Sequence, residues 1–295
     1  MSRGCYVFSL MTRENDYQLA QLTELQSIAH SLDLDIEVFD AGNDAIAQTQ
    51  HLLQVIMRPQ NRPLGILCNA VGSGMPQVAR AAAAAGIGWA ILNREVDYLE
   101  TLWNRHHVPA CSVRPDQTAV GRIQGSQMNA LLPGGGSVLC VTGPTSSSVT
   151  AKRMTGMQSV LNSNFELHSI HGQWTQESAY RAVGIWLQLT TSREKATRLV
   201  VCHNDDMAQG ARQAFLNDGP QWKHLRFLGI DGLPAGGQSL VRQKILLATV
   251  VLPHTAGTAL KLLEESRRTG KQPPAETLLD PVSYPAVSTL TAIPS

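Results

Sequence analysis

The sequence has no clear excess of charge of either sign. Its 295 residues include 24 lysines and arginines against 23 aspartates and glutamates, so the formal net charge is +1. A surface that binds nucleic acid needs clustered lysine and arginine to displace counterions from the phosphates. The charge balance therefore argues against a nucleic-acid-binding protein. Long apolar runs are also absent, because no window approaches the roughly 18 unbroken apolar residues of a membrane span.

Cysteine is scarce and widely spaced. The five cysteines are Cys5, Cys68, Cys111, Cys140 and Cys202. A metal site would need two such ligands a few residues apart, and no such pair exists here. Each cysteine lies inside an apolar run, so we expect unpaired, buried thiols on strands. Five unpaired thiols favour a reducing compartment.

The N-terminus lacks the pattern of a secretory signal. Residues 1–8 run almost at once into an apolar, strand-like segment. They contain no charged leader, long apolar region and small-residue cleavage site in succession. We therefore expect that a signal was removed or that the protein is cytoplasmic.

The common enzyme motifs are missing as well. There is no Gly-x-Ser-x-Gly nucleophile elbow, and the glycine run 134–136 lacks the lysine of a phosphate-binding loop. The nine histidines include no His-x-x-x-His pair. Cys202 and His203 stand close to two aspartates, but neighbours on a strand-to-helix turn point in different directions. We expect no enzyme, no metal site and no cofactor.

Short apolar runs alternate with helical patterns along almost the whole chain. Between the runs, apolar residues recur three and four positions apart, as in Leu19, Leu22 and Leu25, which indicates amphipathic helices. The alternation is typical of parallel sheets covered by helices on both faces. The runs are too many for one such sheet, so we expect an α/β protein with two doubly wound, Rossmann-like lobes. The expected strands are residues 5–11, 35–39, 65–68, 88–92, 108–113, 137–142, 166–170, 199–202, 225–230 and 246–251.

Polar side chains follow the ends of these strands, where open parallel sheets bind their ligands. Amides, carboxylates, guanidinium groups and aromatic rings dominate, which suits a neutral polyhydroxylated ligand. Ordinary alternatives exist for each residue. Asn204 can cap a helix, and Asp231 can close a turn with Gly232. Arg153 can be a surface charge and Trp174 a half-buried core ring. Their concentration at strand ends favours binding.

Several segments resemble the sugar-type (type I) periplasmic binding proteins, in particular the ribose- and galactose-binding proteins. Residues 204–211, Asn-Asp-Asp-Met-Ala-Gln-Gly-Ala, are similar to the family's Asn-Asp-x-Met-Ala-x-Gly-Ala segment. Residues 229–232 resemble its Gly-Phe-Asp-Gly strand end, and residues 246–250 resemble its Leu-Ala-Ala-Thr-Val strand. Further matches lie at residues 93–94, 116–117 and 153–157. The similarity runs in the same order over nearly the whole chain.

This resemblance implies two lobes that are joined by three hinge crossovers and enclose a ligand cleft. The N-terminal lobe would comprise residues 1–110 and 253–281, and the C-terminal lobe residues 111–252 and 282–295. Arginines from opposite lobes would donate to hydroxyls, aromatic rings from both lobes would stack on the ligand, and an aspartate would accept. The implied ligand-binding residues are Asn15, Tyr17, Asn93, Arg94, Gln117, Arg153, Trp174, Asn204 and Asp231.

The resemblance also implies a function. The protein would capture a monosaccharide or polyol by hinge closure and deliver it to the membrane permease of an ABC transporter. It would be a periplasmic monomer without a nucleic-acid partner, or cytoplasmic if the chain is complete. The alternative is the cytoplasmic sugar-sensing effector domain of a lac-repressor-type regulator, which shares the fold. Such a domain would lack its helix-turn-helix here, because the first strand begins near Cys5.

Three departures from the family pattern affect the expected ligand. Gln18 replaces one of the two aromatic residues of the first turn. Asn93 stands where the family has aspartate, which removes a strong acceptor, and Leu252 stands where it has glutamine. We expect a pocket for a polyol that need not be ribose or galactose.

Overall fold

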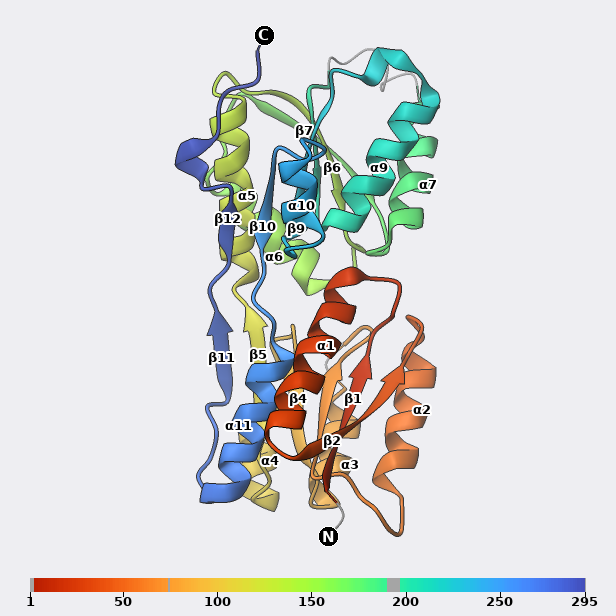
Figure 1. Cartoon of the computed structure of the whole chain (residues 1–295), viewed down its shortest axis with the longest axis vertical. Coiled ribbons are helices and arrows are strands. Elements are labelled where there is room, and N and C mark those ends of the chain that lie inside the picture. Colours follow the sequence, from red (N-terminus) through yellow and green to blue (C-terminus); the bar gives the residue numbers. More distant parts are fainter. Residues whose placement is uncertain (1–2, 74, 190–196, 295) are drawn as a thin grey trace. The chain divides into compact units, whose positions relative to one another are not determined.

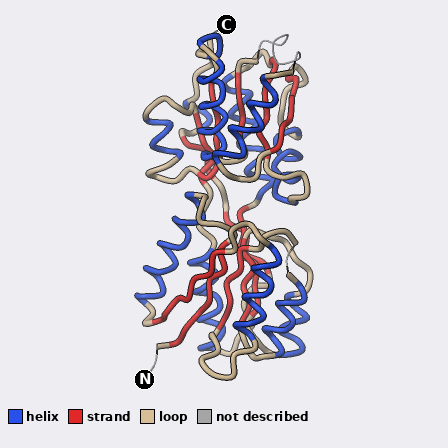
Figure 2. Tube along the Cα trace, turned by 90° about the vertical axis from the view of Figure 1, so that its right-hand side faces the viewer, coloured by secondary structure: helices blue, strands red, loops and turns tan. Residues whose placement is uncertain are grey.

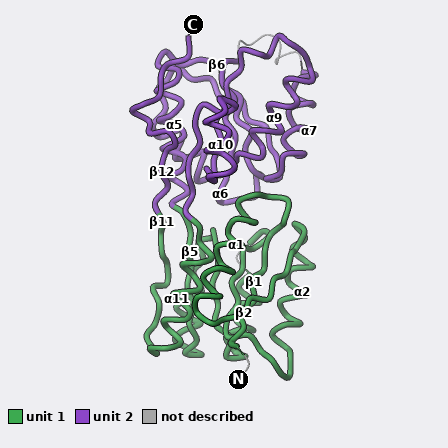
Figure 3. The backbone as a smooth tube through the Cα atoms, viewed as in Figure 1, with its two compact units in different colours: residues 1–115, 254–279 green, residues 116–253, 280–295 purple. Residues whose placement is uncertain are grey.

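The chain forms two compact units, each built on its own six-stranded sheet (Figure 1). The structure is a computed structural model that describes residues 3–73, 75–189 and 197–294. The first unit comprises residues 1–115 and 254–279, and the second comprises residues 116–253 and 280–295 (Figure 3). The chain therefore passes between the units three times.

The sheet of the first unit has the order β11-β5-β4-β3-β1-β2 and is entirely parallel. Successive side chains of its first strand, β1, point to opposite faces of the sheet: Val7 packs on one face, and Tyr6 and Phe8 pack on the other. Helices α2, α3 and α4 cover the first face, and α1 and α11 cover the second. The elements are β1 (Gly4–Leu10), α1 (Asp16–Ser31), β2 (Leu34–Asp40), α2 (Ala45–Ile56), β3 (Gly65–Asn69), α3 (Pro76–Ala84), β4 (Gly88–Leu92), α4 (Leu99–His106), β5 (Ala110–Pro115), α11 (Ala256–Thr269) and β11 (Glu276–Leu279).

The sheet of the second unit has the order β12-β10-β9-β8-β6-β7, and only β12 runs antiparallel among its described strands. Leu139 and Val141 pack against α7 and α9, while Val138 and Cys140 pack against α5 and α6. The elements are α5 (Gln117–Leu131), β6 (Gly136–Thr142), α6 (Ser148–Gln158), β7 (Phe165–His171), α7 (Gln176–Leu187), β8 (Leu199–Cys202), α9 (Asp205–Asp218), the 3₁₀ turn η1 (Pro220–Trp222), β9 (Arg226–Asp231), α10 (Gly237–Arg242), β10 (Ala248–Val251), β12 (Val282–Tyr284) and the 3₁₀ turn η2 (Val287–Thr289).

The predicted α/β class is confirmed, with helices on both sides of the strands in each unit (Figure 2). Every predicted apolar run is a strand, and the bounds differ by at most two residues. The five cysteines are unpaired, as predicted, although Cys5 is only partly buried. The structure adds β11 and β12, which the sequence pattern did not indicate. Within the ranges that the structure describes, no helix has the length and apolar character needed to cross a membrane.

Candidate functional site

The carboxyl ends of three neighbouring parallel strands form one edge of the second unit's sheet. Strands β6, β8 and β9 lie side by side in the same direction. Gly143 follows β6, His203 and Asn204 follow β8, and Asp231 ends β9. Because parallel strands end at the same edge, this is where an open α/β sheet can hold a ligand.

Arg153, on α6, is held at this edge by hydrogen bonds. Its Nε donates to Gln117 Oε1 at 2.8 Å, and Nη1 donates to the carbonyl oxygen of His203. The guanidinium carbon lies 5.7 Å from the centroid of the Trp174 ring. Only 4% of Arg153 is exposed, so it is not the solvated surface charge that the sequence left open. The structure thus brings three of the predicted residues, Gln117, Arg153 and Trp174, together.

His203 is a part of this cluster that the sequence analysis did not select. Its ring stacks on Trp174, with centroids 6.5 Å apart and planes 20° apart. Burial, followed by the charge of Arg153 and the neighbouring His171, holds the pKa of His203 well below its usual value. The ring is therefore neutral near pH 7, and its Nδ1 accepts from the Gly143 N–H at 3.3 Å. Its Nε2 is buried without a hydrogen-bond partner in the described chain.

Asn204 serves two structural purposes. Its Oδ1 accepts from Met207 N at 2.8 Å, which confirms the helix-cap interpretation at the start of α9. Its Nδ2 donates to the carbonyl oxygen of Trp174 at 2.9 Å. That bond helps to hold Trp174 at φ 66°, a left-handed conformation that is costly for a bulky residue. The half-buried indole also packs against the core of the second unit. The alternative that Trp174 is a half-buried core ring is therefore correct in part.

Two aspartates of this edge have different surroundings. The Asp205 carboxylate accepts from Gly232 N at 2.8 Å and from Thr249 Oγ1 at 2.7 Å, so it ties α9 to the turn after β9. Asp231 itself has φ 110°, which is strained for any residue except glycine. The turn is thus fastened by Asp205. Leu252, whose N–H donates to the Asp231 carbonyl at 3.0 Å, has a buried side chain.

In the first unit, Asn15 and Tyr17 lie at the start of α1. Asn15 is the N-cap, and its Oδ1 accepts from Gln18 N at 3.1 Å. Tyr17 contacts His254 edge to face, with ring centroids 5.8 Å apart. The predicted stacking ring of this unit therefore has an aromatic neighbour, and His254 in turn pairs with Glu24 at 2.7 Å.

Arg94 and Asn93 follow β4. Arg94 Nε donates to the Gly72 carbonyl at 3.1 Å and Nη2 to the Ala70 carbonyl at 3.2 Å, so the guanidinium holds the loop after β3. Burial lowers the pKa of Arg94 from its usual value. Asn93 takes the left-handed conformation at φ 57°, and its N–H donates to the Val113 carbonyl.

Asn69 is the last residue of β3, which lies beside β4 in the first unit's sheet. It was not among the predicted ligand-binding residues. It is 3% exposed, and its Nδ2 has no hydrogen-bond partner in the described chain. The sequence signal that could have selected Asn69 is its position directly after the expected strand 65–68. Among the described residues, no group of histidine, cysteine and acidic side chains is arranged to hold a metal ion.

A family model described as a periplasmic binding protein domain matches residues 6–264. The chain belongs to the periplasmic binding protein family. The D-allose-binding periplasmic protein of Escherichia coli (strain K12) is 24% identical over 276 residues, which cover 92% of this chain and 87% of that protein. The family resemblance seen in the sequence is therefore confirmed.

Solved structures of proteins that bind sugars or myo-inositol share the fold. A galactofuranose binding protein matches with a TM-score of 0.84 and 22% identity, over 95% of this chain and 94% of its own. The Caulobacter myo-inositol binding protein, bound to myo-inositol, matches with a TM-score of 0.82 and 21% identity, over 96% and 93%. The binding protein of the arabinose ABC transporter from Shewanella sp. ANA-3 has a TM-score of 0.82 and 19% identity, over 96% and 93%.

Proposed function

We propose that this chain is a non-catalytic, periplasmic solute-binding protein that captures a small neutral sugar or polyol by hinge closure and delivers it to an ABC-type permease. The arrangement around Arg153 carries the proposal. A fixed guanidinium, a half-buried indole and a strand-end aspartate gather at one edge of the second unit's sheet. These groups match the donors, acceptors and apolar C–H faces of a sugar ring.

The relatives support this class of ligand. They are named for allose, galactofuranose, arabinose and myo-inositol, which are neutral polyhydroxylated compounds. The family relationship favours binding over catalysis, and it does not favour the alternative of a regulator's effector domain. We further propose that the first unit contributes Asn15, Tyr17, Asn93 and Arg94 to the same ligand, and that Asn204 acts mainly by holding Trp174.

A thermal-shift screen tests the proposed function. Monosaccharides and cyclic polyols should raise the melting temperature in a concentration-dependent way, because a ligand that binds only the folded state stabilises it. A ligand at about 100 times its Kd adds about 2.7 kcal/mol to the free energy of unfolding. Amino acids of similar size serve as the control panel. A shift with amino acids and none with sugars or polyols would contradict the proposal.

Gly143→Ala is expected to weaken sugar binding by up to about tenfold, because it displaces the Trp174 ring. A Cβ atom at residue 143 would lie 2.2 Å from two atoms of the indole and 2.7 Å from Thr150 Oγ1. Tryptophan fluorescence and calorimetric titration measure the displacement and the loss of affinity.

Gly184→Ala is the matched control for this variant. Gly184 lies within α7, and a Cβ there meets nothing within 4 Å. This variant should keep the affinity of the wild type and gain up to about 1 kcal/mol of stability, since alanine favours a helix over glycine. If Gly143→Ala also kept the wild-type affinity, the indole would not be a part of the binding site.

A further inference from the structure

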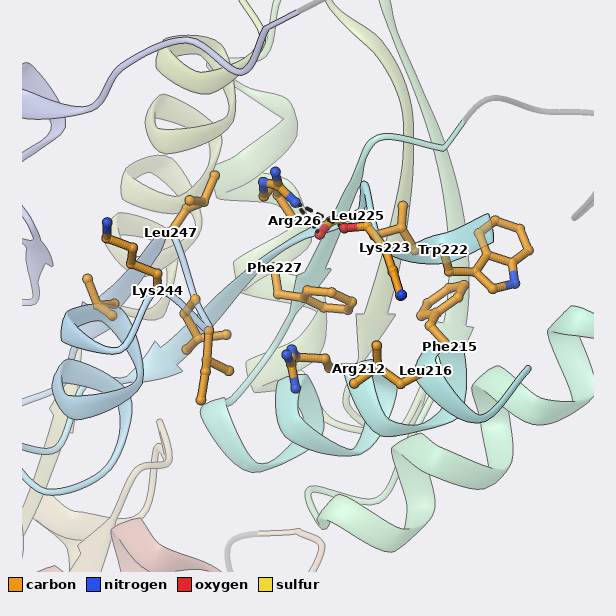
Figure 4. Close-up of a pocket in the computed structure, with 13 residues that line it drawn as sticks. Arg212, Phe215, Leu216, Trp222, Lys223, Leu225, Arg226, Phe227, Lys244 and Leu247 are labelled. Carbon is orange, nitrogen blue, oxygen red and sulfur yellow. Dashed lines mark hydrogen bonds between the residues drawn. The ribbon is translucent and has the colours of Figure 1, made fainter. Parts of the chain in front are cut away.

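A cavity lies at the end of the second unit's sheet that is opposite to the candidate sugar site. Its volume is about 760 Å³, and it is lined by residues of α9, η1, the amino-terminal end of β9, α10 and the segment 244–247 before β10 (Figure 4). Strand β9 separates the cavity from the candidate sugar site, because Arg226 and Phe227 at its start line the cavity while Asp231 is its last residue. A cavity of roughly 300–1,000 Å³ is typical of sites for small molecules.

Aromatic rings form much of its wall. Phe215 and Trp222 lie with ring centroids 5.1 Å apart, and Phe215 and Phe227 lie 6.2 Å apart. These rings belong to or pack against the hydrophobic core of the second unit, so the wall is fixed by packing. Leu216 adds an apolar side chain that is 39% exposed. Phe215 and Phe227 are only 1% and 4% exposed. The half-buried Trp222 ring and the Leu216 side chain are therefore the apolar groups that a ligand can contact.

The charges around this wall are all of one sign. Four of the thirteen described residues that line the cavity are basic, namely Arg212, Lys223, Arg226 and Lys244, and none is acidic. None of the four forms an ion pair with a carboxylate within the described ranges. This contrasts with the chain as a whole, whose net charge is only +1. A concave surface of one charge sign beside low-dielectric walls attracts ions of the opposite sign.

Two of the cations that line the cavity come from segments that also carry its aromatic residues. Arg212 belongs to α9, as Phe215 does, and Lys223 directly follows Trp222 of η1 (Figure 4). Arg226 is instead directed to backbone carbonyl groups, because its Nη1 donates to the oxygens of residues 223, 224 and 225. Arg212 and Lys223, whose side chains make no hydrogen bond among the described residues, are better placed than Arg226 to receive an anionic group.

Asp218, the last residue of α9, accepts hydrogen bonds from side chains of η1. The Asp218 carboxylate accepts from Trp222 Nε1 at 2.7 Å and from Gln221 Nε2 at 3.0 Å. These bonds fix the outer edge of the indole and partly satisfy the carboxylate. A sugar would find few acceptors in this cavity, because its lining has no carboxylate, amide or hydroxyl side chain among the described residues.

We propose that this cavity is a second binding site, separate from the sugar site, for an organic anion with an aromatic body. The carboxylate or phosphate of the ligand lies against Arg212 and Lys223, and its ring packs on Trp222 and Leu216. Both halves of the ligand are needed: the ring supplies buried apolar area, and the anion pairs with cations that otherwise face water.

Calorimetric titration with indole-3-acetate tests this site. Indole-3-acetamide, which has the same ring without the charge, and acetate, which has the charge without the ring, are the matched probes. We expect indole-3-acetate to bind at one site per chain, and each of the other two to bind at least about tenfold more weakly. Equal affinity for the acid and the amide would overturn the proposal, as would the absence of binding by indole-3-acetate.

Substitutions assign the binding to this cavity. R212Q and K223Q should each weaken indole-3-acetate binding by about tenfold and leave the melting temperature close to the wild-type value. K271Q is the control, since Lys271 is an exposed lysine of the first unit, and it should bind like the wild type. If R212Q and K223Q kept the wild-type affinity, the basic side chains would only cover the apolar wall with their stems, and the proposed site would be wrong.

Discussion

Asp231→Gly is expected to weaken sugar binding by about tenfold to a hundredfold without a comparable loss of stability. Hydrogen bonds to a carboxylate contribute roughly 1.5–3 kcal/mol each, and about 1.4 kcal/mol corresponds to a factor of ten in Kd. Glycine removes both acceptor oxygens. It also removes the backbone strain of a residue held at φ 110°, which costs about 1–3 kcal/mol. Calorimetric titration and thermal unfolding of the same variant separate the two effects.

Asp205→Asn is the contrasting variant at the same edge of the sheet. Asp205 accepts from Gly232 N and Thr249 Oγ1, so we expect this change mainly to lower the melting temperature. Asp231→Asn should be milder in affinity than Asp231→Gly, because the amide keeps one acceptor oxygen. If Asp231→Gly bound the sugar at wild-type affinity, Asp231 would be a turn residue only.

Arg153→Ala is expected to lower the affinity by at least about tenfold to a hundredfold and the melting temperature as well. Its guanidinium donates to Gln117 and to the His203 carbonyl, so both acceptors lose a donor in a buried setting. An unsatisfied buried polar group costs about 1–3 kcal/mol. Measured affinities at a temperature where the variant is folded isolate the binding effect.

Arg122→Ala is the matched control for the loss of an arginine in the second unit. Arg122 is an exposed residue of α5 that pairs with Asp116 at 3.5 Å, and such surface pairs contribute about 0–1 kcal/mol. This variant should match the wild type in affinity and nearly so in stability. Equal affinity of Arg153→Ala and Arg122→Ala would exclude Arg153 from the binding site.

Much of the fold could be predicted from the sequence, because buried parallel strands are nearly continuous apolar runs. Residues 65–68 and 199–202 are such runs, and both lie in the centre of a sheet. The strands β11 and β12 could not be predicted in the same way. They are edge strands of four and three residues, and neither is fully buried. Without a long apolar run, their pairing depends on tertiary contacts that local pattern does not record.

The sequence indicated which sheet edge carries the candidate residues, but it did not indicate most of the contacts among them. Strand ends in the sequence located Arg153, Asn204 and Asp231 at one edge, as the topology requires. Sequence could not distinguish Asp205 from Asp231 as the residue that fastens the turn. It also did not indicate that His203 stacks on Trp174, because that contact joins residues distant in sequence through the packing of α9 and the loop after β7.

The most direct test of the account is the calorimetric titration of the wild-type protein with the sugar or polyol that gives the largest thermal shift. The account predicts one ligand molecule per chain, with affinity reduced about tenfold or more both by Arg153→Ala in the second unit and by Tyr17→Ala in the first. Binding that survives both substitutions unchanged would contradict the proposal that residues of both units hold one neutral sugar.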